Sequence, residues 1–117
     1  MQVPLQIIFR HMDASRAVEA RIRERCHRLE QFAEHIIRCR ITIEAPYEPR
    51  HHTGLYQVKI SLALTGGEMI VSHDLEQPHE HEDIYVAIRD AIDAVRDQLE
   101  ECVRLRREEI RLQVSMP

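Results

Sequence analysis

The stretch YQVKISLALTGGEMIVS, residues 56–72, decides the fold. Apolar and polar residues alternate through its first half, which is the period of a strand with one buried face. The TGGE segment at 65–68 then predicts a hairpin, because Gly66 and Gly67 can adopt the positive φ angles that tight turns need. A short strand from Glu68 to about Ser72 completes an antiparallel pair.

Upstream of this hairpin, the sequence predicts a strand, a helix and another strand. Capping side chains at Asp13 and Ser15 precede an apolar stripe at three- and four-residue steps over residues 18–33, which predicts an amphipathic helix. Apolar and polar residues alternate over residues 3–9 and again over residues 37–44. The second of these strands should bury Ile37, Cys39, Ile41 and Ile43.

Downstream, the segment PHEHEDIYVAIRDAI, residues 78–92, begins a long amphipathic helix whose apolar stripe continues to Val103. We interpret Glu82 and Asp83 as residues of its first turn, where exposed amides and the helix dipole stabilise carboxylates. Acid/base catalysis would also need an apolar pocket that shifts a pKa. The sequence contains no nucleophile elbow, phosphate-binding glycine loop or HExxH motif. We therefore expect no enzyme activity.

The predicted elements follow the order β-α-β-β-β-α, which indicates an α+β fold with a four-stranded mixed sheet. Every strand has one polar face, so both helices should pack on one face of the sheet. The helical crossover should make the first two strands parallel, and the later pairs should be antiparallel. A chain of 117 residues should form one domain, residues 1–117.

Composition limits the classes of function. No apolar run approaches the roughly 18 residues of a membrane span, and the N-terminus lacks the features of a signal peptide, so we expect a cytoplasmic protein. Cys26, Cys39 and Cys102 lie far apart among apolar neighbours, which favours small core residues over disulfides. A net charge of −4 argues against a generic nucleic-acid binder, so any such role needs a local basic patch.

Histidines gather in the loops that the predicted topology brings to one end of the molecule. Imidazole is a good zinc ligand, but these loops contain no cysteine and no regular ligand spacing. We predict neither a metal site nor a cofactor, and a histidine-rich metal-binding variant stays an alternative. The loop histidines are His11, His51, His52, His73, His79 and His81, of which His51, His52, His79 and His81 are the candidate ligands.

Three groups of basic residues could contact phosphates. They are Arg21, Arg25 and Arg28 on the first helix, Arg10, Arg38, Arg40 and Lys59 on the open face of the sheet, and Arg104, Arg106, Arg107 and Arg111 near the end of the long helix. Each group also has an ordinary explanation. Glu24 and Arg28 have the spacing of an i,i+4 ion pair, Glu44 offsets the sheet group, and cations near a helix C-terminus complement the dipole.

Three segments together resemble one family. RLEQF at 28–32 closes the first helix, GGE at 66–68 makes the hairpin, and HEDIYVAI at 81–88 opens the second helix. In this order the chain is similar, over nearly its whole length, to the ribosome hibernation-promoting factor and ribosome-associated inhibitor family, whose older members were labelled sigma-factor modulation proteins. The sequence ends soon after the second helix, so the resemblance is to the short members.

The resemblance implies a non-enzymatic protein that binds small-subunit rRNA in the decoding channel, overlaps the mRNA and tRNA sites, and keeps the ribosome idle under stress. The family's basic positions near the end of the first helix match Arg25 and Arg28. The small ribosomal subunit is the expected partner, without a membrane or a small-molecule substrate. The candidate rRNA-binding residues are Arg21, Arg25, Arg28, Arg38, Arg40, Lys59, Arg89, Arg96, Arg104 and Arg107.

The second helix departs from the family pattern. Ala94, Asp97 and Glu101 stand where members of the family carry basic residues, and a carboxylate facing phosphate weakens binding. The loop 74–82 is also about half a dozen residues longer than the family pattern. The alternative function is therefore a protein-binding module that kept the fold, lost the ribosome, and uses its acidic second helix to contact a basic partner.

Overall fold

The computed structural model describes residues 4–45, 56–67, 69–71, 80–81 and 83–115. The fold is α+β, as predicted. Its elements are, in order, β1 (Leu5–Arg10), α1 (Arg16–Arg25), the 3₁₀ helix η1 (Cys26–His35), β2 (Ile36–Glu44), β3 (Tyr56–Leu64), β4 (Met69–Val71), β5 (Glu80–His81) and α2 (Ile84–Ser115).

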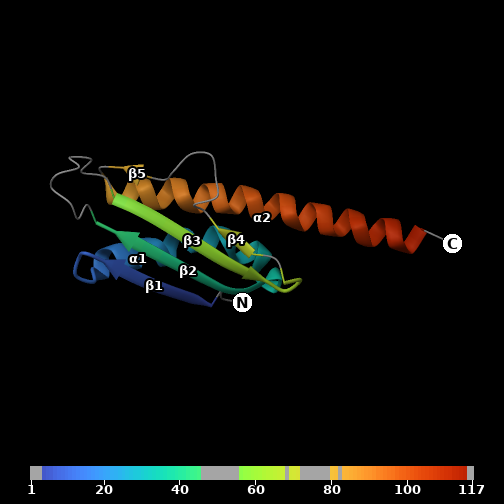
Figure 1. The fold of residues 1–117 in the computed structure, drawn as a ribbon, viewed down its shortest axis with the longest axis horizontal. Helices are drawn as coiled ribbons and strands as arrows, with labels where there is room; N and C mark the ends of the chain where they lie inside the picture. The colour runs from blue at the N-terminus through green and yellow to red at the C-terminus, as the bar shows by residue number, and fades with distance from the viewer. Residues whose placement is uncertain (1–3, 46–55, 68, 72–79, 82, 116–117) are drawn as a thin grey trace.

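The sheet is mixed, and its long strands pair as the sequence predicts. β1 runs parallel to β2, and β2 runs antiparallel to β3 (Figure 1). The other edge of β3 carries two short antiparallel strands, with β4 beside residues 61–63 and β5 beside residues 56–57. The two-residue β5 was not predicted, so the sheet has five strands where four were expected.

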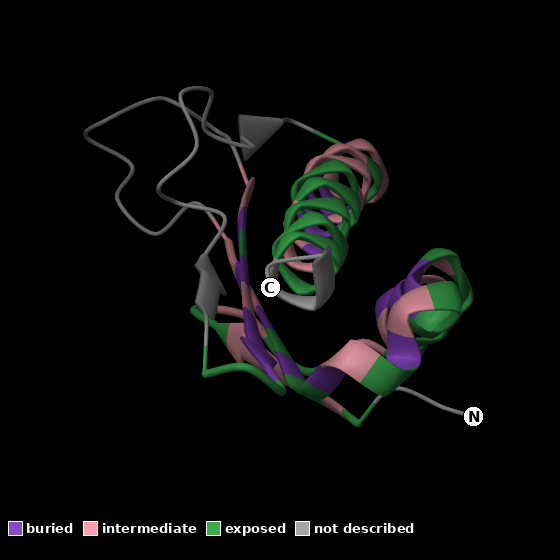
Figure 2. Cartoon of the chain, turned by 90° about the vertical axis from the view of Figure 1, so that its right-hand side faces the viewer, coloured by how far each residue is buried: buried purple, intermediate pink, exposed green. Residues whose placement is uncertain are grey.

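Both helices lie on the same side of the sheet, and the other side is open (Figure 2). The core fills the space between them. Ile7, Ile41 and Ile60 are opposite one another on neighbouring strands and point toward the helices, while Leu29 of η1 and Leu99 of α2 pack onto the same cluster. Burying one such side chain contributes about 1.5–3 kcal/mol, so this layer is the main source of stability.

Side chains cap both helices at their N-termini. The Ser15 hydroxyl accepts a hydrogen bond from the Val18 amide at 3.2 Å, and the Asp83 carboxylate accepts one from the Tyr85 amide at 2.9 Å. Caps of this kind are typically worth about 1 kcal/mol. The capping interpretation is thus confirmed for Asp83, whereas Glu82 lies outside the described residues.

The first helix changes its winding halfway, which the sequence analysis did not predict. We expected one α-helix over residues 18–33, but α1 ends at Arg25 and a ten-residue 3₁₀ helix follows. The apolar spacing explains the change. Val18, Ile22 and Cys26 are four residues apart, whereas Cys26, Leu29 and Phe32 are three apart. A 3₁₀ helix has 3.0 residues per turn, so it keeps Cys26 and Leu29 on the buried side, with Phe32 half-buried and Ala33 buried beside it.

The prediction that Ile37 is buried was wrong. Ile36 is buried instead, and the Ile37 side chain is 52% exposed. The pairing of β2 with β3 shifts register between Ile36 and Arg38, as in a β-bulge. One extra residue in the strand reverses which side chains face the core. Extending the alternation of Cys39, Ile41 and Ile43 toward the start of β2 therefore places Ile37 on the buried face, whereas the bulge puts it on the exposed one.

The hairpin after β3 turns at the predicted glycines, with one difference. The Gly67 amide donates a hydrogen bond to the Leu64 carbonyl at 3.0 Å, and Gly67 has φ +91°. Of the two glycines, Gly67 alone has a positive φ, so the expected positive φ of Gly66 was wrong. A side chain at position 67 would meet no neighbouring atom. Glycine is therefore favoured there by the positive φ of the backbone and not by lack of room.

α2 extends far beyond the core. Among the side chains that the structure describes on α2, the last buried one is Val103, yet the helix continues to Ser115 and projects past the sheet (Figure 1). The projection makes the molecule 62 Å long and only 19 Å thick. It also corrects one interpretation, because Arg104, Arg106 and Arg107 lie more than two turns before the helix end, beyond the range of its dipole.

Candidate nucleic-acid interface

The predicted basic row on the first helix is split by its contacts. The Arg21 guanidinium lies 4.9 Å from the centre of the Tyr85 ring, and its Nε lies 3.8 Å from a Glu24 carboxylate oxygen. A guanidinium at this distance is attracted to the face of the ring. Arg21 is therefore held against the first turn of α2 rather than extended into solvent.

Arg28 connects the two helical segments. Its Nη1 donates a hydrogen bond to Asp93 Oδ1 of α2 at 2.8 Å. The i,i+4 pair expected between Glu24 and Arg28 does not form, because Arg28 lies in η1, where the 3₁₀ winding turns it toward α2. Within the described ranges Arg25 has no carboxylate partner, which makes it the member of this row that can contact a phosphate without competition.

Arg89 and Arg96 of α2 pair with carboxylates of the same helix. Arg89 Nη2 lies 3.1 Å from Asp90 Oδ1, and Arg96 Nη1 lies 3.4 Å from Glu100 Oε2 and 3.8 Å from Asp97 Oδ1. Such exposed pairs contribute at most about 1 kcal/mol. These ion pairs do matter for RNA binding, because an RNA phosphate can bind one of these arginines only by replacing its carboxylate partner.

The same holds for Arg104. It donates hydrogen bonds to Glu101 Oε2 at 3.2 Å and to Glu108 Oε1 at 3.1 Å. The hydrogen bond from Arg104 lowers the pKa of the Glu101 carboxyl, and the same contact raises the pKa of Arg104. Glu101 is one of the acidic residues that depart from the family pattern. It thus forms an ion pair with an arginine that could otherwise bind phosphate.

The open sheet face is the side of the sheet opposite the helices. Strand pairing places its residues in rows across β1, β2 and β3. The rows are Gln6–Arg40–Ser61, Ile8–Thr42–Lys59 and Arg10–Glu44–Gln57, with Arg38 beside Ala63 at the end of the face. The face therefore collects the basic residues that the sequence analysis assigned to it.

Cations on this open sheet face have no carboxylate partner within the described ranges of the chain. Among the residues that the structure describes, Arg10, Arg38, Arg40 and Lys59 form no ion pair, and Arg40 Nε donates instead to the amide oxygen of Gln6 at 3.1 Å. Glu44, a carboxylate on the same face, lies 3.7 Å from His11 Nε2. Because these four cations form no ion pair within the described part of the chain, this is the least neutralised of the three basic groups, despite the net charge of −4.

Two hollows follow the seam between η1 and α2. One is lined by His27, Arg28, Gln31 and Arg96, and the other begins at Gln31 and continues past Phe32 to the projecting part of α2. Gln31 and Phe32 were not predicted as site residues, because the spacing of Phe32 places it in the core stripe and no local pattern gives Gln31 a role. The seam brings together Arg28, Arg96, Arg104 and Arg107, which the sequence places up to 79 positions apart.

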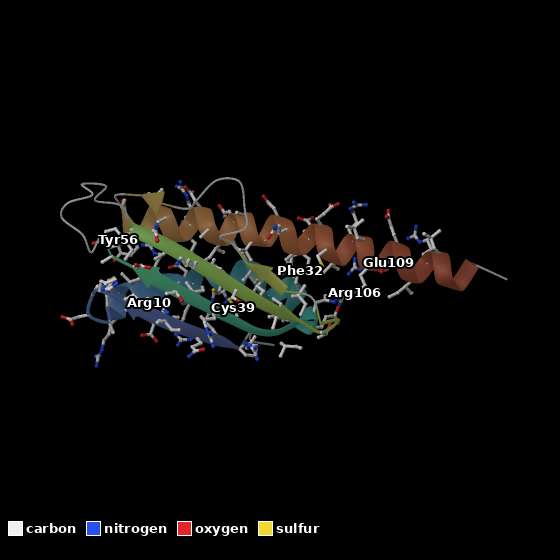
Figure 3. The ribbon with its side chains drawn as sticks, in the orientation of Figure 1. Arg10, Phe32, Cys39, Tyr56, Arg106 and Glu109 are labelled. Carbon is white, nitrogen blue, oxygen red and sulfur yellow. The ribbon has the colours of Figure 1, made fainter. Side chains whose placement is uncertain are left out.

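The third basic group is divided by the rotation of α2. Arg106 turns back to the sheet, where its Nη1 donates to the Thr65 hydroxyl at 3.2 Å beside the β3–β4 turn (Figure 3). Arg107 lines the seam instead. It has no carboxylate partner in the described part of the chain.

The histidine and cysteine predictions have different outcomes. His51, His52, His73 and His79, and the side chain of His81, lie outside the described residues, so the metal-binding alternative stays a prediction. No group of three potential metal ligands occurs within the described residues. Core positions are confirmed for Cys26 and Cys39, while Cys102 is half-buried. The hydrogen bond between the Cys26 and Cys39 thiols, followed by burial, raises the pKa of Cys39.

Comparisons with known proteins agree with this architecture. A sequence model of the family described as "Sigma 54 modulation protein / S30EA ribosomal protein" matches residues 5–107. No curated protein matches the sequence. The N-terminal domain of Protein Y from Thermus thermophilus is 18% identical with a TM-score of 0.65, over 86% of this chain and 98% of that chain.

A second solved structure is similar to the same extent. A ribosomal subunit interface protein from Coxiella burnetii is 17% identical with a TM-score of 0.71, over 87% of this chain and 99% of that chain. At such identities the two likenesses establish the fold. As for membranes, none of the helices described here has an apolar stretch that could cross a bilayer.

Proposed function

Because this chain belongs to the sigma 54 modulation protein / S30EA ribosomal protein family, we propose that it is a ribosome hibernation factor that binds small-subunit rRNA. The family match over residues 5–107 is the observation that carries the proposal, and it confirms the resemblance stated from the sequence. The family is ribosome-associated and non-enzymatic. The protein then acts by occupying a site rather than by catalysis.

The proposed site is the decoding channel between the head and the body of the small subunit, where the protein excludes mRNA and tRNA under stress. A single cytoplasmic domain with no cofactor is sufficient for this role. Cations on both sides of the molecule support a location surrounded by rRNA, with Arg25 and Arg107 on the helical side and Arg38, Arg40 and Lys59 on the open sheet face. Phosphate contacts and shape then provide the recognition.

Cosedimentation with vacant small subunits across a salt series tests this proposal. We expect salt-sensitive binding by the natural protein. In an Arg25→Glu/Arg28→Glu variant binding should weaken by about tenfold or more, because two phosphate contacts are lost and repulsion replaces them. The Arg16→Glu/Arg23→Glu variant is the matched control. It changes the same net charge on the same helix, at residues outside the candidate interface, and should bind almost as the natural protein does.

The alternative function, a protein-binding module, is supported by one observation. Leu105, Ile110 and Leu112 on the projecting part of α2 have exposed fractions of 48%, 55% and 65%. Three exposed aliphatic side chains on eight residues of helix could contact a protein partner. If the purified protein fails to bind vacant subunits even at low salt, the rRNA proposal is wrong and this end of α2 is the place to search for a partner.

A further inference from the structure

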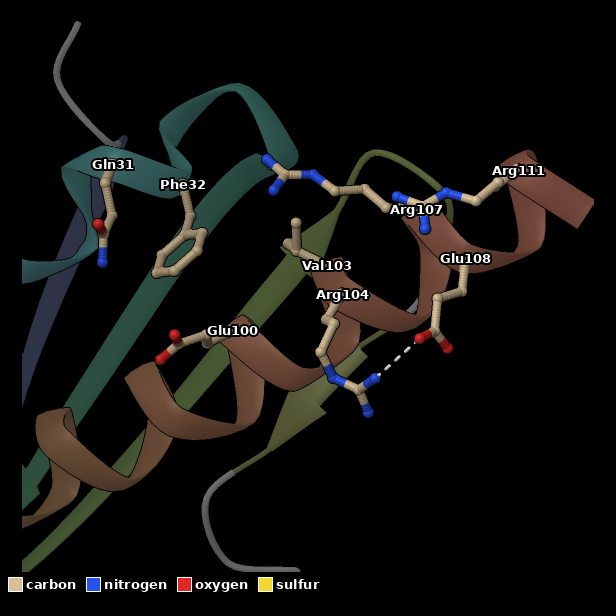
Figure 4. Close-up of a pocket in the computed structure, with 8 residues that line it drawn as sticks. All are labelled: Gln31, Phe32, Glu100, Val103, Arg104, Arg107, Glu108 and Arg111. Carbon is tan, nitrogen blue, oxygen red and sulfur yellow. Dashed lines mark hydrogen bonds and ion pairs between the residues drawn. The ribbon is translucent and has the colours of Figure 1, made fainter.

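A hollow of about 480 Å³ lies between the end of η1 and the projecting part of α2 (Figure 4). Pockets for small molecules commonly measure about 300–1,000 Å³, so this one has room for a ligand of the size of a nucleotide. It lies on the helical side of the molecule, away from the open sheet face. Its existence depends on the length of α2, because half of its wall comes from residues beyond Val103.

One end of the hollow is apolar and aromatic. Phe32 is half-buried and packs against the core cluster, yet its ring also forms part of the wall (Figure 4). The Val103 side chain points toward the ring from α2. An aromatic ring held in place by core contacts is a preformed surface on which a flat ring can stack.

The opposite end of the hollow is cationic. Arg104 is turned away and pairs with Glu101 and Glu108. Arg107 reaches across the mouth toward η1 and, within the described part of the chain, has no carboxylate partner (Figure 4). Arg111, one turn further along α2, lines the same end. A guanidinium that reaches over a hollow and has no carboxylate partner among the described residues is suited to a phosphate, which it can bind through two hydrogen bonds.

Between these two ends lie groups that can form hydrogen bonds with the edge of a base. The Gln31 side-chain amide both donates and accepts, and the Glu100 carboxylate accepts. We propose that this hollow binds a nucleotide, with the base stacked on Phe32 and the phosphate on Arg107. The proposal does not depend on binding to the ribosome, because the site is complete within one chain.

Two sources could supply such a nucleotide. One is a free mononucleotide. The other is an unpaired nucleotide of a single-stranded RNA, whose neighbouring phosphate would reach Arg28 and Arg96 in the adjoining hollow, since Gln31 lines both. The shared chemistry is an aromatic base joined to a phosphate, and the two sources differ in the length of chain that binds.

The test measures binding of the purified full chain to 5′-mononucleotides and to tetraribonucleotides by isothermal titration. Phe32→Leu removes the aromatic face but keeps an apolar side chain in the core, and Arg107→Gln removes the cation from an exposed position. Each variant should weaken binding by about tenfold. Arg23→Gln, with the same loss of charge on α1, is the control and should bind as the natural protein does. Thermal melting of each variant verifies that it folds.

Each outcome decides the proposal. Binding of mononucleotides that both variants weaken supports the site and identifies a free nucleotide as sufficient. Binding of tetraribonucleotides alone, again weakened by both variants, supports the site and identifies RNA as the source. The proposal is overturned if neither ligand binds at millimolar concentration, or if Arg107→Gln, which leaves the core untouched, binds as tightly as the control.

Discussion

Replacing Leu99 with alanine should lower the free energy of unfolding by about 2–5 kcal/mol. Leu99 is fully buried on α2 and belongs to the cluster that joins both helices to the sheet. Its truncation removes apolar contacts and leaves a cavity that the surrounding side chains fill only in part. The total free energy of unfolding of a small domain is about 5–15 kcal/mol, so this one substitution would remove a large share of it.

The same helix provides a matched control. Leu105 lies beyond the core and is 48% exposed, so Leu105→Ala should change the free energy of unfolding by no more than about 0.5 kcal/mol. Urea titrations of both variants, followed by circular dichroism, give the comparison. Equal losses at Leu99 and Leu105 would contradict the described end of the core at Val103, because they would require the projecting part of α2 to be packed.

Reversing two charges on the open sheet face, as Arg38→Glu/Arg40→Glu, should weaken binding to vacant small subunits by about 100-fold. Both side chains are exposed, and neither has a carboxylate partner among the described residues, so each can meet a phosphate directly. The salt dependence should become shallower as well, because each lost contact lowers the slope by about one. Cosedimentation at several salt concentrations measures both quantities.

The control for this result is again Arg16→Glu/Arg23→Glu, which changes net charge equally without altering the open sheet face. A loss of affinity in both variants would indicate a general effect of charge. Unchanged binding by Arg38→Glu/Arg40→Glu would show that rRNA contacts only the helical side. Because Arg89, Arg96 and Arg104 of α2 already pair with carboxylates, that outcome would leave Arg25 and Arg107 as the main phosphate contacts.

The sequence predicted the fold well where its local pattern and its packing agree. Alternation over residues 56–64 identified β3 with its observed bounds, and Asp83 caps α2 as expected. It failed where a single residue changes the geometry. The bulge before Arg38 exposes Ile37, and the three-residue spacing after Cys26 produces η1. Alternation and amphipathic stripes look the same on either side of such a change, so periodicity alone does not reveal it.

The candidate interface could be predicted only in part. The basic residues of the open sheet face follow directly from strand alternation, and they form no ion pair with any residue that the structure describes. Ion pairing across the fold could not be predicted, because Arg28 and Asp93 are 65 residues apart and meet through the packing of η1 on α2. The hollow beside Phe32 could not be predicted for the same reason, since its walls come from two segments that are far apart in the sequence.

The projecting part of α2 has a consequence for local stability. The helix continues for twelve residues past Val103, the last of its described side chains to be buried, and a helical segment of about 12 residues is marginal in water without tertiary contacts. Amide hydrogens near Leu112 should therefore exchange with solvent far faster than those near Leu99, with Arg106 and its contact to Thr65 near the boundary. The end of α2 is thus a natural reporter, since whatever docks there will slow its exchange before anything changes in the core.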